Sequence, residues 1–270
     1  MKNSLKSAAE KKLLIAAHRG VWGGNIAPNT IEAFEAALAQ GADILEMDVL
    51  RTVDNHLVVF HTGMEKYHLG RDICLNNLTE KEILSIPYVN IDGVETEQRI
   101  QSFDSVLKRF KGRCFLNIDR GWEDLELVTK AVERYGMQDQ ILLKSPAKVQ
   151  YFQNVERFAP DYMYMPIITE EDQCSEILET MRINYVGAEL VFKEETSAVA
   201  ADTYICAMHE KGRLLWGNGI VFNYRTKLSA GHSDDISILG HPKDGWGFLR
   251  TKGFDIIQTD WPCLLKQYLL

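Results

Sequence analysis

The sequence lacks the features that mark several common classes of protein. Its five cysteines, at positions 74, 114, 174, 206 and 263, are scattered and include no C-x-x-C pair, which argues against a disulfide framework and a zinc-cysteine site. Basic residues are not in excess, because 30 Lys and Arg stand against 38 Asp and Glu, giving a formal net charge of -8. We therefore expect no broad basic surface for nucleic acid, although a small cationic pocket is compatible with this average.

The chain also lacks a long hydrophobic run near its N-terminus. The apolar segment LLIAA (13 to 17) follows a polar stretch and is too short for the core of a signal peptide or for a membrane span. We expect no membrane span and a cytoplasmic location, unless a leader has been removed. No internal repeat or low-complexity tract is present.

What the sequence does have is a regular series of short apolar runs rich in β-branched residues. Most of them are separated by stretches with helical spacing, such as NTIEAFEAALAQG, with Asn29 or Thr30 as a plausible N-cap, and EDLELVTKAVERYG, which stops at Gly136. Strands that alternate with helices predict a parallel sheet, and about eight of them predict a TIM (β/α)8 barrel. The runs are 13 to 17, 43 to 49, 114 to 119, 140 to 145, 162 to 168, 184 to 192, 213 to 217 and 254 to 260.

Two segments interrupt this alternation. Residues 50 to 101 contain an extra strand-like piece, HLVVFH, and a short helix around TEKEILSI, so we expect a small subdomain inserted after the second strand of a single domain spanning 1 to 270. Residues 218 to 247 are rich in Gly, Asn, Ser and Asp and show little periodicity. A loop of this length in a compact enzyme is usually functional or disordered.

Three carboxylates follow or end predicted strands. Glu46 and Asp48 are two residues apart, so a strand would point both to the same side, and Asp119 ends the next barrel strand. In a TIM barrel the carboxyl ends of the strands meet at one face, where active sites are assembled. Three anions together need a cation, and hard oxygen ligands favour magnesium, calcium or manganese. Taken singly, each carboxylate is as well explained as a solvated strand end or a helix cap.

Two histidines end apolar strands beside these carboxylates. His18 follows LLIAA and His61 follows LVVF, whereas His56, His68 and His209 are expected to be ordinary surface or core residues. Imidazole exchanges protons near neutral pH. A histidine on each side of a phosphorus atom, with a cation and an arginine on the non-bridging oxygens, would suit an in-line displacement.

The N-terminal segments AHRG and APNTIEAFEAALAQGADILEMDVLRTVDNHLVVFH resemble the signature of the glycerophosphodiester phosphodiesterase family. The segments LLWG and GFDIIQTDWPCLLKQYL resemble its tryptophan-bearing strand and its closing turn. The resemblance implies a phosphoric diester hydrolase that releases glycerol 3-phosphate and an alcohol from a small-molecule substrate. It further implies His18 and His61 as the acid-base pair, Glu46, Asp48 and Asp119 as ligands of one divalent cation, and Arg19 as a phosphate contact.

The chain departs from the family pattern at three positions. Thr62 follows His61 where the family commonly has Asp, and Gly121 stands where it commonly places Lys. Asp119 replaces the usual Glu, which resembles the related spider-venom-type phospholipase D enzymes that release a cyclic phosphate. Two alternatives therefore stay open: a phospholipase D-like cleavage of lysophospholipids, and a catalytically silent barrel that binds a phosphoester.

Further candidates line the predicted mouth of the barrel. Lys144, near the end of the strand ILLKS, is expected to supply the charge that Gly121 cannot, with extension of its side chain to solvent at the rim as the alternative. Strand alternation should turn Arg120 away from the site, unless the strand has already ended at Asp119. Trp216 is expected to form an apolar wall for the substrate, with a role as barrel core filler as the alternative. In the loop before the last strand, His232, Asp234 and Asp235 are candidates for the pocket rim, with a turn followed by an N-capped helix near Pro242 as the alternative.

Overall fold

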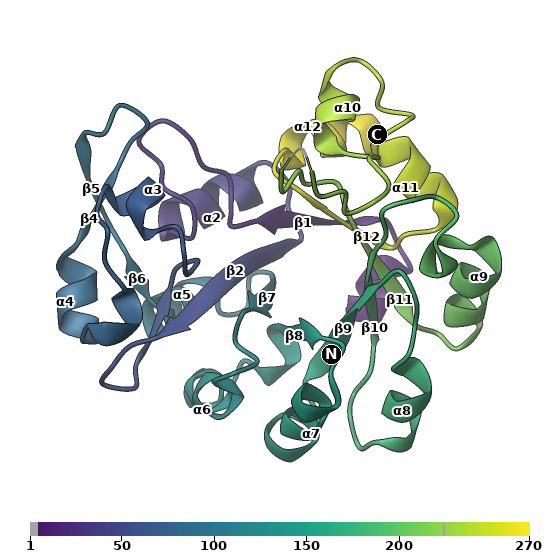
Figure 1. Cartoon of the computed structure of the whole chain (residues 1–270), viewed down its shortest axis with the longest axis horizontal. Coiled ribbons are helices and arrows are strands. Elements are labelled where there is room, and N and C mark those ends of the chain that lie inside the picture. The colour runs from purple at the N-terminus through teal and green to yellow at the C-terminus, as the bar shows by residue number, and fades with distance from the viewer. Residues whose placement is uncertain (1–4, 224) are drawn as a thin grey trace.

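A computed structural model describes residues 5–223 and 225–270 of the chain. Within them, eight parallel strands form a closed ring, because β1 pairs with both β2 and β12. The predicted TIM barrel and each of its eight strand positions are confirmed, and Figure 1 shows the ring with its surrounding helices. The strands are β1 (Leu14–His18), β2 (Ile44–Arg51), β7 (Phe115–Asp119), β8 (Ile141–Pro146), β9 (Met163–Thr169), β10 (Gly187–Val191), β11 (Leu214–Asn218) and β12 (Ile256–Thr259).

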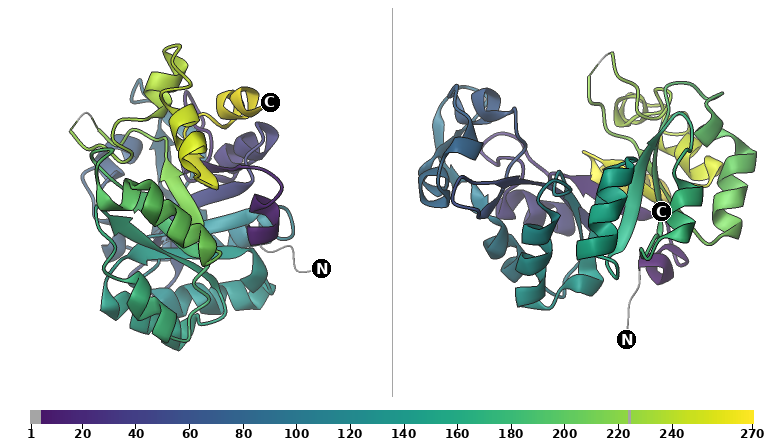
Figure 2. Two further views of the ribbon diagram at one scale, coloured as in Figure 1. Left: turned by 90° about the vertical axis from the view of Figure 1, so that its right-hand side faces the viewer. Right: turned by 60° about the horizontal axis from the view of Figure 1, so that its bottom comes forward.

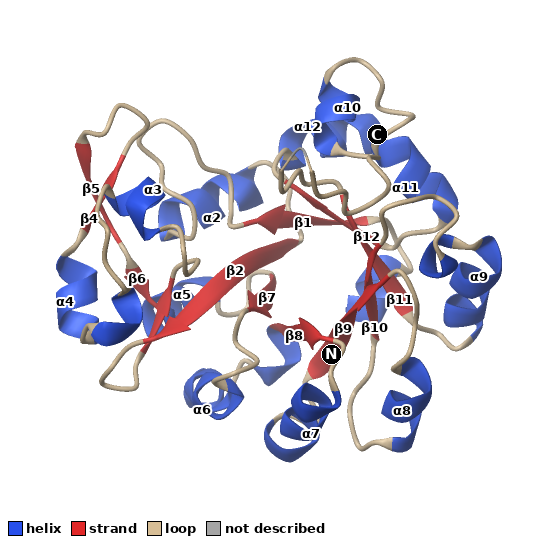
Figure 3. Ribbon diagram, in the orientation of Figure 1, coloured by secondary structure: helices blue, strands red, loops and turns tan. Residues whose placement is uncertain are grey.

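Helices cover the outside of this ring (Figure 3). They begin and end where the sequence provides caps: the Thr30 side chain accepts a hydrogen bond from the backbone N–H of Ala33 at the start of α2, and Gly136, with φ of 61°, ends α6. The outer helices are α2 (Ile31–Ala39), α5 (Phe103–Phe110), α6 (Leu125–Tyr135), α7 (Val149–Phe158), α8 (Ser175–Thr180), α9 (Asp202–Glu210), α11 (Trp246–Lys252) and α12 (Pro262–Leu269).

Two separate apolar clusters fill the barrel and the layer between strands and helices. The cluster that includes Leu14, Ala16, Leu142, Met165 and Trp216 also receives Leu5 from the short helix α1 (Leu5–Ala9), while a larger cluster packs the outward-facing strand residues against the helices. Side chains of alternating strand residues therefore point to opposite faces, as the strand period of two requires.

The segment between β2 and β7 forms a lobe beside the barrel (Figure 1, left; Figure 2, right). Its apolar residues make a third cluster around Phe60, Ile83 and Tyr88. Thr79 and Glu82 form a capping box at the start of α4, which confirms the helix predicted at TEKEILSI. The lobe contains β3 (Leu57–Val59), α3 (Glu65–Leu69), η1 (Leu75–Asn77), α4 (Glu80–Ser85), β4 (Pro87–Val89), β5 (Glu95–Arg99) and β6 (Gln101–Ser102).

The loop predicted over 218 to 247 contains a short helix, α10 (Asp234–Ile238), before α11 begins. Ser233 caps α10 by accepting a hydrogen bond from the backbone N–H of Ile236. The sequence did not predict α10, and the helix expected near Pro242 corresponds to α11, which begins only at Trp246. Two 3-10 turns, η2 (Gln138–Gln140) and η3 (Ala198–Ala200), complete the elements. Among the helices of the described residues, none has the length and hydrophobicity that crossing a bilayer requires.

Candidate active site

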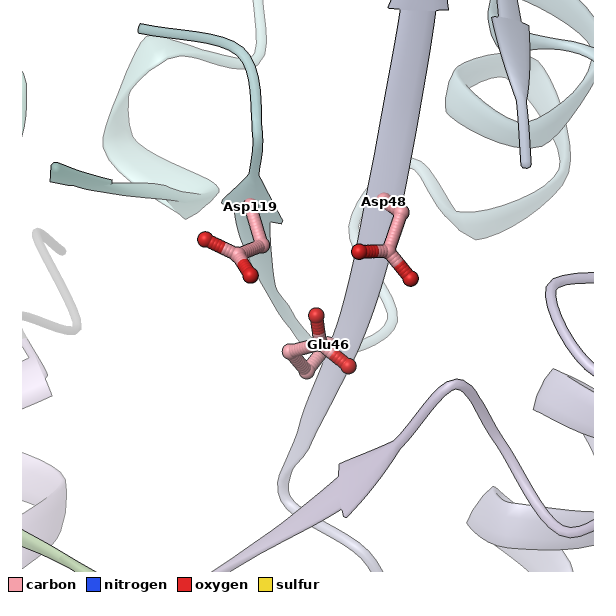
Figure 4. A group of neighbouring side chains, drawn as sticks. All are labelled: Glu46, Asp48 and Asp119. Atoms are coloured by element: carbon pink, nitrogen blue, oxygen red, sulfur yellow. The ribbon is translucent and has the colours of Figure 1, made fainter. Parts of the chain in front are cut away.

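Glu46, Asp48 and Asp119 lie together at the carboxyl end of the barrel (Figure 4). Glu46 and Asp48 project from the same side of β2, and Asp48 is the register partner of Asp119 on β7. One oxygen from each carboxylate lies within 4.8 Å of the others. The sequence spacing therefore predicted this cluster correctly as a structural unit.

Burial and mutual repulsion disfavour the ionised forms of these groups. Burial, together with the charge of Asp48, raises the pKa of Glu46 to about 8. The same two causes raise the pKa of Asp119 to about 6. Among the described residues, Asp119 Oδ1 has no hydrogen-bond partner although it is buried. A buried oxygen without a partner in a group of three carboxylates fits a hard divalent cation.

His18, the last residue of β1, lies at the same end of the barrel. Its Nδ1–H donates to Asp260 Oδ1 across 2.8 Å. Burial alone would lower the pKa of His18, but this hydrogen bond and the charge of Glu46 outweigh it, so the pKa lies above its usual value. Asp260 was not singled out from the sequence, although the resemblance included the turn that carries it.

His61 reaches the site by a different route from the one predicted. It follows β3, which runs antiparallel to β2, and the backbone N–H of Phe60 donates to the Asp48 carbonyl. The antiparallel return, and not the end of a barrel strand, thus brings His61 Nε2 to 4.0 Å from Asp48 Oδ1. Burial lowers the pKa of His61 to about 4, so the ring is neutral at pH 7.

Two arginines lie next to the Asp48 carboxylate. Arg19 Nε lies 3.0 Å from Asp48 Oδ2, and the backbone N–H of Arg19 donates to Glu46 Oε2. Arg120 Nε lies 3.4 Å from Asp48 Oδ1. The prediction that Arg120 turns away was wrong, because β7 ends at Asp119 and the φ of 57° at Arg120 redirects its side chain.

Asn29 holds Asp48 from a third direction. Its Nδ2 donates to Asp48 Oδ2 across 2.9 Å, and its Oδ1 accepts from the Asp48 backbone N–H. The sequence offered Asn29 only as a possible helix cap, but Thr30 is the cap of α2. From the sequence alone, the APNT segment gave no indication that Asn29 would hydrogen-bond a buried carboxylate.

Lys144 is buried inside the mouth of the barrel. Its Nζ lies 2.7 Å from Glu189 Oε2 and 3.2 Å from the centre of the Trp216 ring. The alternative in which Lys144 extends to solvent is therefore excluded, and its charge partly offsets the rise in the pKa of Asp119. Glu189, which also accepts from Asn218 Nδ2, was missed from the sequence.

Trp216 does not form the apolar wall that was predicted. It is fully buried, its indole N–H donates to Gln258 Oε1, and it belongs to the cluster inside the barrel. The alternative of a core filler is the correct one. Strand alternation points both Lys144 and Trp216 into the barrel. The indole ring therefore lies beneath the Lys144 ammonium group and not at the surface.

A lysine at Gly121, as in the family pattern, would not point toward the carboxylates. A Cβ added at Gly121 would lie 3.1 to 3.2 Å from side-chain atoms of Val49, Ile118 and Val128. The position therefore faces the packed layer between barrel and α6, away from the carboxylates. Any phosphate-binding cation has to come from another residue.

The candidates of the last loop are engaged in local structure. His232 stacks on Phe248 and hydrogen-bonds the Asp244 carbonyl through Nδ1, while its Nε2 lies 3.0 Å from Glu195. Both of its ring nitrogens are thus occupied. Asp235 is exposed on the first turn of α10.

Asp234 is buried and has a role that the sequence did not suggest. It accepts hydrogen bonds from Trp246 Nε1 and Thr259 Oγ1 through one oxygen, and from the Asp260 backbone N–H through the other. Burial raises its pKa to about 6 despite these donors. Asp234 thereby fixes the turn that presents Asp260 to His18.

Two buried carboxylates, the half-buried Asp119 and two histidines thus meet at the carboxyl end of the barrel, the face where TIM-barrel enzymes assemble their active sites. A model of the glycerophosphoryl diester phosphodiesterase family matches residues 18–157, just over half of the chain, so the protein belongs to this family. A second model, described as a domain of unknown function, matches residues 164–269.

Two curated relatives match about half of the chain. A glycerophosphodiester phosphodiesterase of Caldanaerobacter subterraneus is 30% identical over 144 residues, which cover 50% of this chain and 58% of the relative. YhdW of Bacillus subtilis is 27% identical over 57% of this chain and 64% of its own length. The matched region thus spans less than two thirds of each of these relatives.

Solved structures agree with the fold over nearly the whole chain. A glycerophosphoryl diester phosphodiesterase from Parabacteroides distasonis superposes with a TM-score of 0.75 and 16% identity, covering 95% of this chain and 85% of that one. A phosphodiesterase from Oleispira antarctica, solved in complex with the product sn-glycerol-3-phosphate, gives a TM-score of 0.67 and 14% identity, covering 96% and 98%. At these identities the likeness establishes the barrel.

Proposed function

We propose that this protein hydrolyses glycerophosphodiesters to glycerol 3-phosphate and an alcohol. The observation that carries the proposal is the meeting of His18 and His61 with the carboxylates of Glu46, Asp48 and Asp119 at one end of the barrel. Membership of the family and the product bound to the Oleispira antarctica phosphodiesterase support the same substrate class.

In this proposal Glu46, Asp48 and Asp119 hold one divalent cation, with magnesium, calcium and manganese as the candidates. The donor set is entirely oxygen, and the carboxylates are otherwise forced together without enough compensating charge. When bound, such a cation supplies charge stabilisation to the non-bridging oxygens of a phosphodiester.

His18 and His61 are proposed to exchange protons with the attacking and leaving oxygens. Asp260 orients the imidazole of His18 through Nδ1, which leaves Nε2 for the substrate. His61 is half-buried, and its buried Nδ1 has no hydrogen-bond partner among the described residues. An imidazole with a free nitrogen beside the carboxylates suits an acid-base role.

Arg19 and Lys144 are proposed to bind phosphate, and the position of Arg120 adds a third cation. Arg19 presents a planar fork next to Asp48, whereas Lys144 provides a point charge near Asp119. We also propose that the chain acts as one barrel domain and that the insert of residues 50 to 101 closes one side of the site. His61 at the edge of that insert supports this arrangement.

The direct test is a panel of glycerophosphodiesters assayed for released glycerol 3-phosphate, with and without EDTA. Magnesium-dependent release that is lost in His18→Asn and Asp119→Asn supports the proposal. Release of a cyclic phosphate instead would favour the phospholipase D-like alternative. Absence of turnover with every cation would leave the silent binding barrel as the better account.

A further inference from the structure

The structure has a concave region outside the carboxylate cluster. It is a pocket of about 400 Å³ between the loop that follows β1, helix α3 and the β4–β5 hairpin. Figure 1 shows these three segments gathered on the lobe side of the barrel. A volume of this size is within the range that holds a small organic ligand. Nothing in the catalytic proposal uses it.

The pocket exposes several large apolar side chains. Trp22, Tyr67 and Ile91 are 43%, 66% and 90% exposed, and all three line it. The rings of Trp22 and Tyr67 both pack edge-on against His68, at 5.7 Å and 5.0 Å between ring centres. Apolar side chains gathered in a pocket, in contrast to single exposed ones, mark a binding site.

Two lining residues connect this pocket with the catalytic residues. His68 is buried. Burial lowers the pKa of its imidazole to about 4, with smaller contributions from the charges of Arg19 and His61. Tyr88 is also buried, and the charge of Asp48 adds to the effect of burial in raising its pKa. The pocket therefore adjoins the residues proposed to bind and cleave the phosphodiester.

The hydroxyl of Tyr88 is an unsatisfied polar group in the lining of this pocket. It is buried and has no hydrogen-bond partner among the described residues. Such a group is uncommon in native proteins and suggests an absent partner, because a buried polar atom without a hydrogen bond costs free energy. A ligand oxygen placed between the pocket and Asp48 would provide that partner.

The charges of the residues that line the pocket indicate which kind of ligand it favours. Among the described lining residues there is no Asp or Glu, and the one fully charged side chain is Lys66. A cationic group such as a quaternary ammonium would find aromatic rings here, but the charged side chain of Lys66 in the lining would repel it. An uncharged apolar group meets no such opposition.

We infer that this pocket, lined by Trp22, Ile26, Tyr67, His68, Tyr88 and Ile91, binds the uncharged, apolar alcohol portion of the phosphodiester. The inference rests on the proposed function, because it assigns one half of the substrate of that reaction. It makes the pocket a specificity site, while the glycerophosphate half occupies the carboxylate cluster and the arginines.

The test compares glycerol phosphodiesters of methanol, octanol and choline, with kcat/KM measured by release of glycerol 3-phosphate. We expect the octyl ester to exceed the methyl ester by about tenfold, as apolar pockets typically discriminate, and the choline ester to show no preference over the methyl ester. Trp22→Ala and Tyr67→Ala should each reduce the octyl-to-methyl ratio several-fold. Leu239→Ala, which removes an apolar side chain that is 77% exposed outside the pocket, should leave the ratio unchanged.

The outcomes separate the two proposals. If wild-type protein cleaves the methyl ester but neither Trp22→Ala nor Tyr67→Ala changes the octyl-to-methyl ratio, the pocket assignment is overturned and the proposed reaction stands. Preference for the choline ester would also overturn the assignment. Failure of the wild-type protein to cleave any of the three esters with magnesium, calcium or manganese would overturn the proposed function itself.

Discussion

Replacing Glu46 with glutamine tests the cation site without an activity assay. Glu46 is 2% exposed and shares its surroundings with Asp48 and Asp119, so its pKa is raised to about 8 from a usual value near 4.5. Because each pKa unit corresponds to about 1.4 kcal/mol, ionised Glu46 destabilises the metal-free folded protein by on the order of 3 to 5 kcal/mol at alkaline pH.

The sign follows from proton binding. Between about pH 4.5 and pH 8 the folded state holds a proton on Glu46 that the unfolded state releases, so the free energy of unfolding falls as the pH rises through this window. In EDTA at pH 8, Glu46→Gln should therefore melt at a higher temperature than wild type, by on the order of 5 to 10 °C. The amide oxygen of glutamine still accepts from the Arg19 backbone N–H.

Addition of magnesium should reverse this order. Cation binding stabilises wild type, because it binds the folded state, and stabilises Glu46→Gln much less. Glu35→Gln is the matched control: hydrogen bonds from Arg113 and Arg109 on the outside of the barrel lower the pKa of Glu35 to about 2, so the same substitution should be mildly destabilising and should not alter the response to magnesium. A lower melting temperature for Glu46→Gln in EDTA, or equal stabilisation of both proteins by magnesium, would refute the reasoning.

Three further changes test individual side chains. Asp260→Asn removes the carboxylate charge and weakens the hydrogen bond that raise the pKa of His18, so the limb of the kcat/KM pH profile set by His18 should move to lower pH; an unmoved profile would exclude this role. His18→Asn and His61→Asn should each lower kcat by orders of magnitude with melting temperatures near that of wild type, and near wild-type rates in both would mean that the pair is structural. Lys144→Met and Arg120→Met should each lower kcat/KM by about tenfold, since a charge-assisted contact contributes roughly 1.5 to 3 kcal/mol; a normal rate in Lys144→Met beside a crippled Arg120→Met would restrict phosphate binding to the arginines.

The barrel could be predicted from sequence because its strands are buried on both faces and therefore appear as nearly continuous apolar runs. Helix boundaries followed from local signals such as Thr30 and Gly136, which act through their own backbone. The carboxylate cluster was equally accessible, since the strand period places Glu46 and Asp48 on one face and the parallel topology places Asp119 beside them. For the carboxylate cluster, the strand period and the parallel topology together were sufficient for the prediction.

Contacts made across long sequence separations could not be predicted in this way. Asp260 lies 242 residues from His18, and Lys144 meets Glu189 across 45 residues. No periodicity within either strand specifies which charged side chain faces it from another strand. His68 was assigned to the background for the same reason, because its proximity to Arg19 depends on how the inserted lobe packs on the barrel.

The side chains around Asp48 show why strand alternation fails where the chemistry is concentrated. Arg19, Asn29 and Arg120 all contact Asp48, and all three have left-handed backbone conformations with φ of 56°, 59° and 57°. This conformation is unfavourable for residues with a Cβ, by on the order of 1 kcal/mol each, and such strain is found preferentially at functional sites. Each left-handed residue turns its side chain from the direction that the preceding strand would give it. These backbone conformations therefore let three polar side chains converge on one carboxylate, and they explain why Arg120 lies in the site although strand alternation would turn it away.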